Sequence, residues 1–147
     1  MKSLFEETAF KEIMERIDLL EEKSPRKWGK MTVGQMIWHC QLPILTAVKN
    51  KKPQKKGSLL AQWFFKKSMY NDKPMRKNLP TSSQLKAKET RDFYKEHKIL
   101  NQLVQDLYAV KEREQWNPNP LFGSFTKEQW GKMQYKHLDH HLRQFGV

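Results

Sequence analysis

The sequence has very little cysteine and no long hydrophobic run. Its 147 residues include one cysteine, Cys40, which excludes an internal disulfide framework and any cysteine-rich zinc motif. No apolar stretch approaches the roughly 18 residues that a membrane-spanning helix needs. The N-terminus, MKSLFEETAF, lacks the apolar segment and the small-residue cleavage site of a secretory signal. These absences predict a cytoplasmic protein that has no membrane contact.

Strand-like alternation of polar and apolar residues is also missing over any useful length. Apolar residues instead recur three and four positions apart, as on one face of a helix. This spacing predicts helices over about 3–23, 32–49, 58–70 and 84–113, and a last helix that Thr126 caps. A threonine followed three residues later by glutamine forms a capping box, and the pairs Thr32/Gln35 and Thr126/Gln129 fit this pattern. We therefore expect an all-α fold, a four-helix up-and-down bundle with one extra short helix, as a single domain over residues 1–147.

The positive charge is concentrated in the middle of the chain. The net charge is +12, and residues 49–98 carry fifteen basic and four acidic side chains. Within them, KNKKPQKKG (49–57) is a lysine-rich loop. Such a run can contact nucleic acid or another polyanion, although a solvated loop that keeps the protein soluble is the commoner case.

Three histidines stand close together near the end of the chain, in YKHLDHHLRQF. On a helical wheel His137 and His141 lie one turn apart on the side of Trp130 and Leu138, which faces the core. His140 lies at the border with the charged face. Two inward imidazoles four residues apart can hold one metal ion, and without a partner their burial would be costly.

A third ligand is available in the apolar helix over 32–49, where His39 points into the predicted bundle. A lone histidine on such a helix is more often a hydrogen-bonded core residue, so both interpretations stay open. His97 is a less favoured ligand at the edge of an apolar stripe, and Cys40 is best interpreted as a small buried hydrophobic residue.

The two histidine-bearing segments resemble a known family. MTVGQMIWHCQ (31–41) and LFGSFTKEQWGKMQYKHLDHHLRQFGV (121–147) resemble the DinB-like (DinB/YfiT-like) superfamily, and the second resembles an uncharacterised bacterial subfamily of it. The resemblance implies an up-and-down bundle with a long crossover and, in many members, a homodimer. It also implies a divalent metal held by one histidine of the second helix and a pair from the last, here His39, His137 and His141.

Members of the family that the chain resembles have different functions. Some are thiol-dependent S-transferases, one is a thiol-dependent isomerase, and many have no known activity. Three imidazoles leave a metal ion an open position, as in catalytic sites. We therefore expect a metal-dependent enzyme, a thiol-dependent S-transferase or hydrolase, that acts on a small-molecule substrate. Zn²⁺ fits best, with Ni²⁺, Fe²⁺ or Mn²⁺ as alternatives and a low-molecular-weight thiol as a further cofactor. His140, Gln144 and Arg143 are candidates to support the ligands or contact the substrate.

Two other functions compete with this one. A non-enzymatic interaction protein would use the basic section over 49–98 to bind nucleic acid or another polyanion. Alternatively, the metal could be purely structural, so that removing a ligand would unfold the chain. The sequence leaves the substrate, the metal and the oligomeric state open.

Overall fold

The computed structural model describes residues 1–54, 59–79 and 85–147, and these residues form an all-α structure. Their regular structure is helical apart from one isolated bridge between Asn119 and Gly123. The helices are α1 (Glu7–Asp18), α2 (Val33–Lys49), the short α3 (Leu59–Phe64), the 3₁₀ turn η1 (Lys67–Met69), α4 (Phe93–Ala109) and α5 (Lys127–Gln144).

Capping side chains explain where three of the long helices begin. In α2 and α5 both halves of the capping box are present, so the predictions at Thr32 and Thr126 are confirmed. The helix predicted from about 84 begins instead at Phe93, because the Asp92 carboxylate accepts a hydrogen bond from the backbone N–H of Lys95.

Three predicted boundaries were too wide. The first helix, predicted over 3–23, spans Glu7–Asp18. The segment predicted as one short helix over 58–70 contains α3 and η1, and its residue 58 lies outside the described residues. The long helix predicted over 84–113 ends at Ala109, and residue 84 also lies outside the described part.

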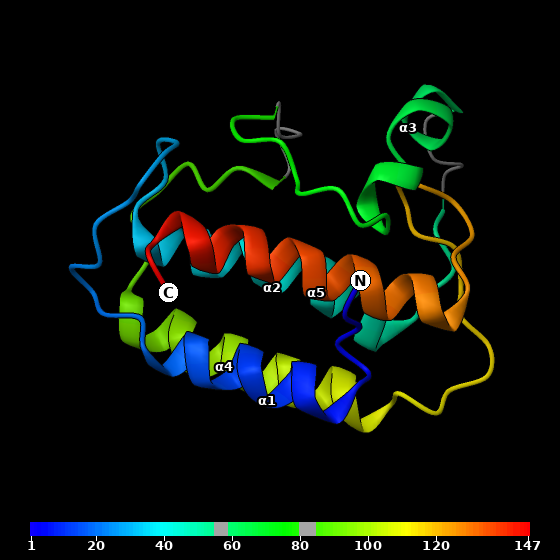
Figure 1. Cartoon of the computed structure of the whole chain (residues 1–147), viewed down its shortest axis with the longest axis horizontal. Coiled ribbons are helices and arrows are strands. Elements are labelled where there is room, and N and C mark those ends of the chain that lie inside the picture. Colours follow the sequence, from blue (N-terminus) through cyan, green and yellow to red (C-terminus); the bar gives the residue numbers. More distant parts are fainter. Residues whose placement is uncertain (55–58, 80–84) are drawn as a thin grey trace.

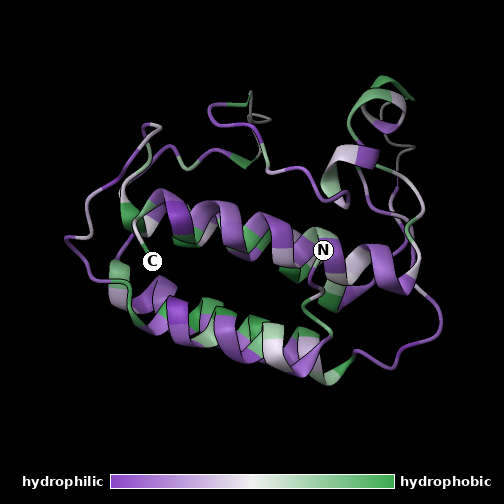
Figure 2. Cartoon of the chain, in the orientation of Figure 1, coloured by the Kyte–Doolittle hydropathy of each residue, from purple (hydrophilic) through white to green (hydrophobic). Residues whose placement is uncertain are grey.

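The four longer helices pack around one hydrophobic core (Figure 1). Both α1 and α2 contact both α4 and α5. In Figure 2 the facing sides of these helices carry the hydrophobic residues, which follows from their amphipathic spacing. The core includes Leu4, Ile13, Ile37, Leu107, Trp130 and Leu138, all at most 1% exposed.

The connection from α2 to α4 brings the chain back to the end at which α2 began. The side chain of Gln35, near the start of α2, donates to the carbonyl of Glu89, just before α4 begins. Arg113, just beyond the end of α4, donates to the carbonyl of Ala47, near the end of α2. The two helices therefore run parallel, as Figure 1 also shows.

A glycine permits the close approach of α2 to the segment before α4. A Cβ atom on Gly34 would lie 2.3 Å from the backbone oxygen of Arg91, which is too close for any other residue. This contact holds the start of α2, and with it His39, against the returning chain.

Candidate metal centre

Three buried histidines, one from α2 and two from α5, come close together in the interior of the structure. His39 lies on α2, and His137 and His141 lie one turn apart on α5, which runs antiparallel to α2. One ring nitrogen from each of the three lies within 4.8 Å of the others. We call these residues the His cluster, and its members are between 5% and 8% exposed. The structure thus brings together the three histidines that the sequence singled out.

Hydrogen bonds orient two of the rings. Nδ1 of His39 lies 2.8 Å from the carbonyl oxygen of Leu85, and Nδ1 of His141 lies 2.8 Å from Oε1 of Gln144. Because both partners are oxygen acceptors, each Nδ1 must carry the proton and donate it. Nε2 of both residues is then left with its lone pair, which is the form that binds a metal ion.

Gln144 is itself held in place. Its side-chain amide donates to the carbonyl of Trp28 at 2.8 Å, which leaves its oxygen to accept from His141. Gln144 is only 3% exposed. It therefore supports His141 from the side opposite the cluster, which is the arrangement expected around a metal-binding histidine.

The third ring, His137, has no such support. Its Nε2 lies 3.0 Å from Nε2 of His39, while its Nδ1 is buried without a hydrogen-bond partner. Two ring nitrogens so close need a proton or a cation between them. The short distance between these two Nε2 atoms and the approach of the His141 ring fit a donor set for a divalent ion.

Burial keeps the His cluster uncharged at neutral pH. It lowers the pKa of His39, against which the hydrogen bond to Leu85 acts in part. It lowers the pKa of His141 to about 3, helped by the nearby His39 ring. Burial and the neighbouring imidazoles hold the pKa of His137 well below its ordinary value. Protons therefore compete little with a metal ion for these nitrogens.

His140 and Lys136 lie deeper than the helical wheel predicted. His140 is 7% exposed, and its ring packs against Trp28 and His141. On a helical wheel of α5 Lys136 falls on the charged face, yet it is 5% exposed and donates from Nζ to the carbonyls of Ser68 and Asn71. The wheel failed here because loops, rather than solvent, cover this side of α5.

Arg143 stays at the surface. Its side chain is 52% exposed and forms an ion pair with Asp139 at 3.0 Å. Asp139 is shared, because Arg16 of α1 also binds it at 3.0 Å.

The remaining histidine and the cysteine lie outside the cluster. His97 of α4 contacts α1, where its Nε2 lies 3.0 Å from the carbonyl of Ile17, and its Nδ1 lies 3.3 Å from the side-chain amide of Asn101. Both of its ring nitrogens therefore have protein partners. Cys40 is buried, and burial raises its thiol pKa, so it behaves as the small hydrophobic residue that the sequence predicted.

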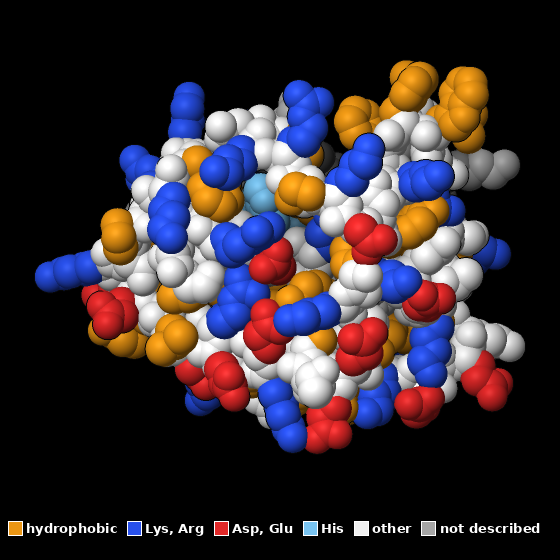
Figure 3. Space-filling view, in the orientation of Figure 1, with side chains coloured by type: hydrophobic (Ala, Val, Ile, Leu, Met, Phe, Trp, Pro, Cys, Tyr) orange, Lys and Arg blue, Asp and Glu red, His pale blue; other side chains and the backbone are white. Residues whose placement is uncertain are grey.

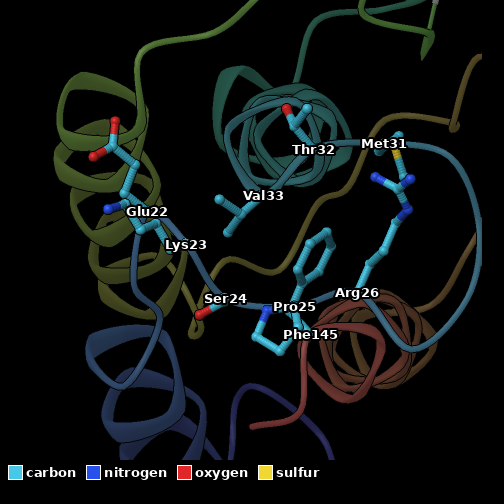
Figure 4. Close-up of a pocket in the computed structure, with 9 residues that line it drawn as sticks. All are labelled: Glu22, Lys23, Ser24, Pro25, Arg26, Met31, Thr32, Val33 and Phe145. Atoms are coloured by element: carbon cyan, nitrogen blue, oxygen red, sulfur yellow. The ribbon is translucent and has the colours of Figure 1, made fainter.

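A pocket of about 490 Å³ lies beside the end of α5, between the loop after α1 and the start of α2 (Figure 4). Its lining consists of Glu22, Lys23, Ser24, Pro25, Arg26, Met31, Thr32, Val33 and Phe145. No member of the His cluster lines it. In the view of Figure 3, histidine atoms reach the surface among lysine, arginine and hydrophobic side chains.

Lys77, Trp28 and His140 stack in a row that ends at the His cluster. Nζ of Lys77 lies 4.3 Å from the ring centre of Trp28, which lies 5.5 Å from the ring of His140. The His140 ring is 5.0 Å from that of His141. Sequence reasoning missed Trp28 and Lys77, because both lie in loops where no helical period places them.

Comparison with known proteins places the chain in a family. Residues 2–146 match the family described as "Protein of unknown function (DUF1569)", and the chain belongs to this family. No curated protein and no solved structure matches the chain. Among the described residues, no helix is both long and apolar enough to cross a membrane.

Proposed function

We propose that this protein is a metal-dependent enzyme of the DinB-like group, in which His39, His137 and His141 hold one divalent ion. The observation that carries the proposal is the convergence of three buried, uncharged imidazoles, two of which are oriented by Leu85 and Gln144. A core without a ligand would gain little from three such rings.

The fold supports the same assignment. The parallel course of α2 and α4 requires the long crossover that the resemblance implies for a DinB-like four-helix bundle. The family match over residues 2–146 fits a single domain. We propose this topology, and a homodimer as in many DinB-like proteins, as part of the assignment.

Three imidazole ligands would leave the ion an open position, where it would lower the pKa of a bound water or thiol and supply a nucleophile. Zn²⁺ suits this donor set best. Around it, the protein contributes fixed groups. His39 and His141 are oriented by their Nδ1 hydrogen bonds, and buried His140 packs against the His141 ring, where its uncharged imidazole can exchange a proton with a bound molecule.

The proposed reaction is attack of a thiol, or of water, on a small electrophilic substrate. A C–S or C–O bond forms, the bond to the substrate's leaving group breaks, and the leaving group departs with the proton of the thiol or water. His140 is proposed to contact the reacting molecule because it is buried between Trp28 and the His cluster. Arg143 is exposed and paired with Asp139. We propose that it attracts a negatively charged substrate and does not act on the reacting atoms.

The test is metal content, measured by mass spectrometry on untagged protein purified without chelator. The native protein is expected to hold about one ion per chain, and the double variant His137→Ala/His141→Ala none. The matched control is His97→Ala, which removes a histidine outside the cluster and should leave the metal content unchanged. Native protein that cannot be loaded with Zn²⁺, Ni²⁺, Fe²⁺ or Mn²⁺ would contradict the proposal.

A structural metal is distinguished by the folding of the same variants. If the ion only stabilises the chain, the His137→Ala/His141→Ala protein should lose its helical circular dichroism. If the site is catalytic, the variant should stay folded while losing the ion. Thiols and electrophiles would then be screened with the loaded native protein, and the folded variant would serve as the blank.

A second candidate function rests on the charge of the middle section. Residues 49–98 have a net charge of +11, and Lys51, Lys52, Lys73 and Lys88 are exposed. Nucleic-acid binding by this section would weaken steeply with salt and would not need the His cluster. Absence of DNA and RNA retention at about 50 mM salt would exclude it.

A further inference from the structure

The short helix α3 exposes an unusual amount of apolar surface. Its residues Leu59, Leu60, Trp63 and Phe64 are 80%, 68%, 83% and 66% exposed, and Phe65, which follows, is 53% exposed. Isolated exposed hydrophobic residues are common, but five large ones within seven positions form a patch of the kind that marks an interaction site.

This patch stands away from the core. The one described element with which α3 packs extensively is the small η1 turn. In Figure 1 α3 lies above the end of the molecule at which α5 begins, and in Figure 3 hydrophobic side chains gather at that corner, with basic side chains directly below. The rings of Trp63 and Phe64 lie 5.5 Å apart, so the two aromatic side chains form one projecting group.

The sequence on both sides of α3 carries charge of one sign. From residue 49 to residue 71 the sequence has seven lysines, no arginine and no acidic residue. Lys51 and Lys52 before α3, and Lys67 after it, are exposed. An apolar projection bordered by lysines complements a surface that is negative outside and apolar beneath.

We propose that α3 and Phe65 anchor the protein to the surface of an anionic lipid bilayer. The leucine and aromatic side chains would enter the boundary between headgroups and acyl chains, and the neighbouring lysines would contact the anionic headgroups. Six helical residues are far too short to span a bilayer, so the contact is peripheral. The proposal departs from the expectation of no membrane contact, which considered only spanning segments and secretion signals.

Two other partners fit the patch less well. A second copy of the chain seated on α3 would bring together the seven lysines over residues 49–71 of each copy, which opposes association. Single-stranded nucleic acid could stack on Trp63 and Phe64, but Leu59 and Leu60 offer no ring for a base, and the section from 49 to 71 lacks arginine. A lipid surface uses both the leucines and the aromatic residues.

The experiment measures how the full chain partitions onto vesicles. Sedimentation would compare vesicles of phosphatidylcholine alone with vesicles that contain about 30% phosphatidylglycerol, an anionic lipid. The native protein is expected to bind the anionic vesicles and to bind the neutral ones much less. The variant Trp63→Ser/Phe64→Ser should lose binding by about tenfold or more, because it removes two of the inserted rings.

The matched control removes exposed apolar side chains elsewhere. Leu19 and Tyr94 are 65% and 68% exposed, so Leu19→Ser/Tyr94→Ser makes a comparable change outside α3. This control should bind like the native protein. All positions are exposed, so both variants should fold, and equal thermal unfolding by circular dichroism checks this. Equal loss of binding in both variants would overturn the proposal.

A spectroscopic measurement locates the contact. Tryptophan emission should shift to shorter wavelength when the native protein meets anionic vesicles, and the shift should disappear in Trp63→Phe, which keeps an aromatic ring and should still bind. An unchanged shift in Trp63→Phe would overturn insertion by α3.

Three further results would overturn the proposal. The first is absence of binding to anionic vesicles. The second is a dimer, seen by sedimentation equilibrium, that Trp63→Ser/Phe64→Ser dissociates. The third is binding to an oligothymidylate, lost in the same variant, that prevents binding to vesicles.

Discussion

The His cluster and α3 depart from the usual distribution of side chains in opposite directions. In the His cluster, three polar rings lie in the interior, each at most 8% exposed. In α3, Trp63 and Phe64 lie outside, at 83% and 66% exposure. The first arrangement is unfavourable because polar groups lose water, and the second because apolar groups face it.

The two regions differ in how far other residues of the protein offset these unfavourable arrangements. Leu85 and Gln144 satisfy one nitrogen each of His39 and His141, whereas Nδ1 of His137 has no partner. For α3 the structure provides little cover beyond η1. This difference is why we propose a small ligand such as an ion for the His cluster and an extended surface as the partner of α3.

The largest expected effect comes from replacing a buried tryptophan, and an exposed tryptophan provides the comparison. Trp130, 1% exposed, fills the core, and Trp130→Ala should lower the free energy of unfolding by about 3–5 kcal/mol. Trp63→Ala should change it by less than about 0.5 kcal/mol. Urea unfolding followed by circular dichroism measures both values. A loss above 2 kcal/mol, well beyond the usual surface effect, in Trp63→Ala would mean that α3 packs against the protein in solution.

The next effect is the acid sensitivity of the metal-free protein. Because the pKa of His141 falls from 6.5 to about 3 on folding, the unfolded chain binds more protons than the folded chain between these pH values. The free energy of unfolding is therefore not reduced by His141 above pH 6.5, and it declines as the pH falls from 6.5 toward 3. At pH 5 the loss from His141 alone should be about 2 kcal/mol.

The variant His141→Gln tests this dependence, since its side chain stays uncharged. Urea unfolding at pH 7 and pH 5 should show a smaller loss of stability in the variant than in the native protein. His97→Gln serves as the control, because its ring lies outside the cluster. The same pH dependence in native and His141→Gln proteins would contradict burial of an uncharged His141.

A smaller effect is expected from Gln144→Ala. This change removes the acceptor of the His141 Nδ1 hydrogen bond and leaves the Trp28 carbonyl unpaired. Zn²⁺ affinity, measured by competition with a chromogenic chelator, should fall by about 10–100-fold. Gln129→Ala removes the same kind of side chain at the start of α5, where it closes a capping box, and should leave the affinity unchanged. Equal affinities in native protein and Gln144→Ala would show that Gln144 does not support the site.

The smallest effect is expected from Arg143→Ala. Its ion pair with Asp139 is half exposed, and Asp139 keeps Arg16 as a second partner. The free energy of unfolding should fall by less than about 1 kcal/mol, and metal content should not change. A larger loss in thermal or urea unfolding would mean that the two arginines and Asp139 act as one network.

The sequence predicted the parts of the fold that local chemistry determines. Thr32 and Thr126 begin their helices by hydrogen bonds within four residues, and the spacing of His137 and His141 places them on one face of α5. His39 lies on a helix that is apolar on nearly every side, which left a core role and a ligand role both open for it. These features need no knowledge of how distant segments meet.

Features that depend on the loops could not be predicted in this way. A helical wheel places Lys136 with the solvated residues, yet the segment around Ser68 and Asn71 covers it and accepts its hydrogen bonds. His140 is covered in the same manner by Trp28. The start of α4 was misplaced because the helical pattern was extended past Asp92, whose capping role depends on where the returning chain turns into the helix.

The distance along the chain between His39 and its partners has a consequence for how the protein reaches its native state. His39 and His137 are 98 residues apart, and the intervening chain includes the whole crossover and α4. Closing so large a loop is slow, so these contacts should form late in folding. The three nitrogens are therefore assembled only after most of the chain is in place. During refolding, Zn²⁺ uptake should therefore report the last folding step. It should occur later than the recovery of the helical circular dichroism signal.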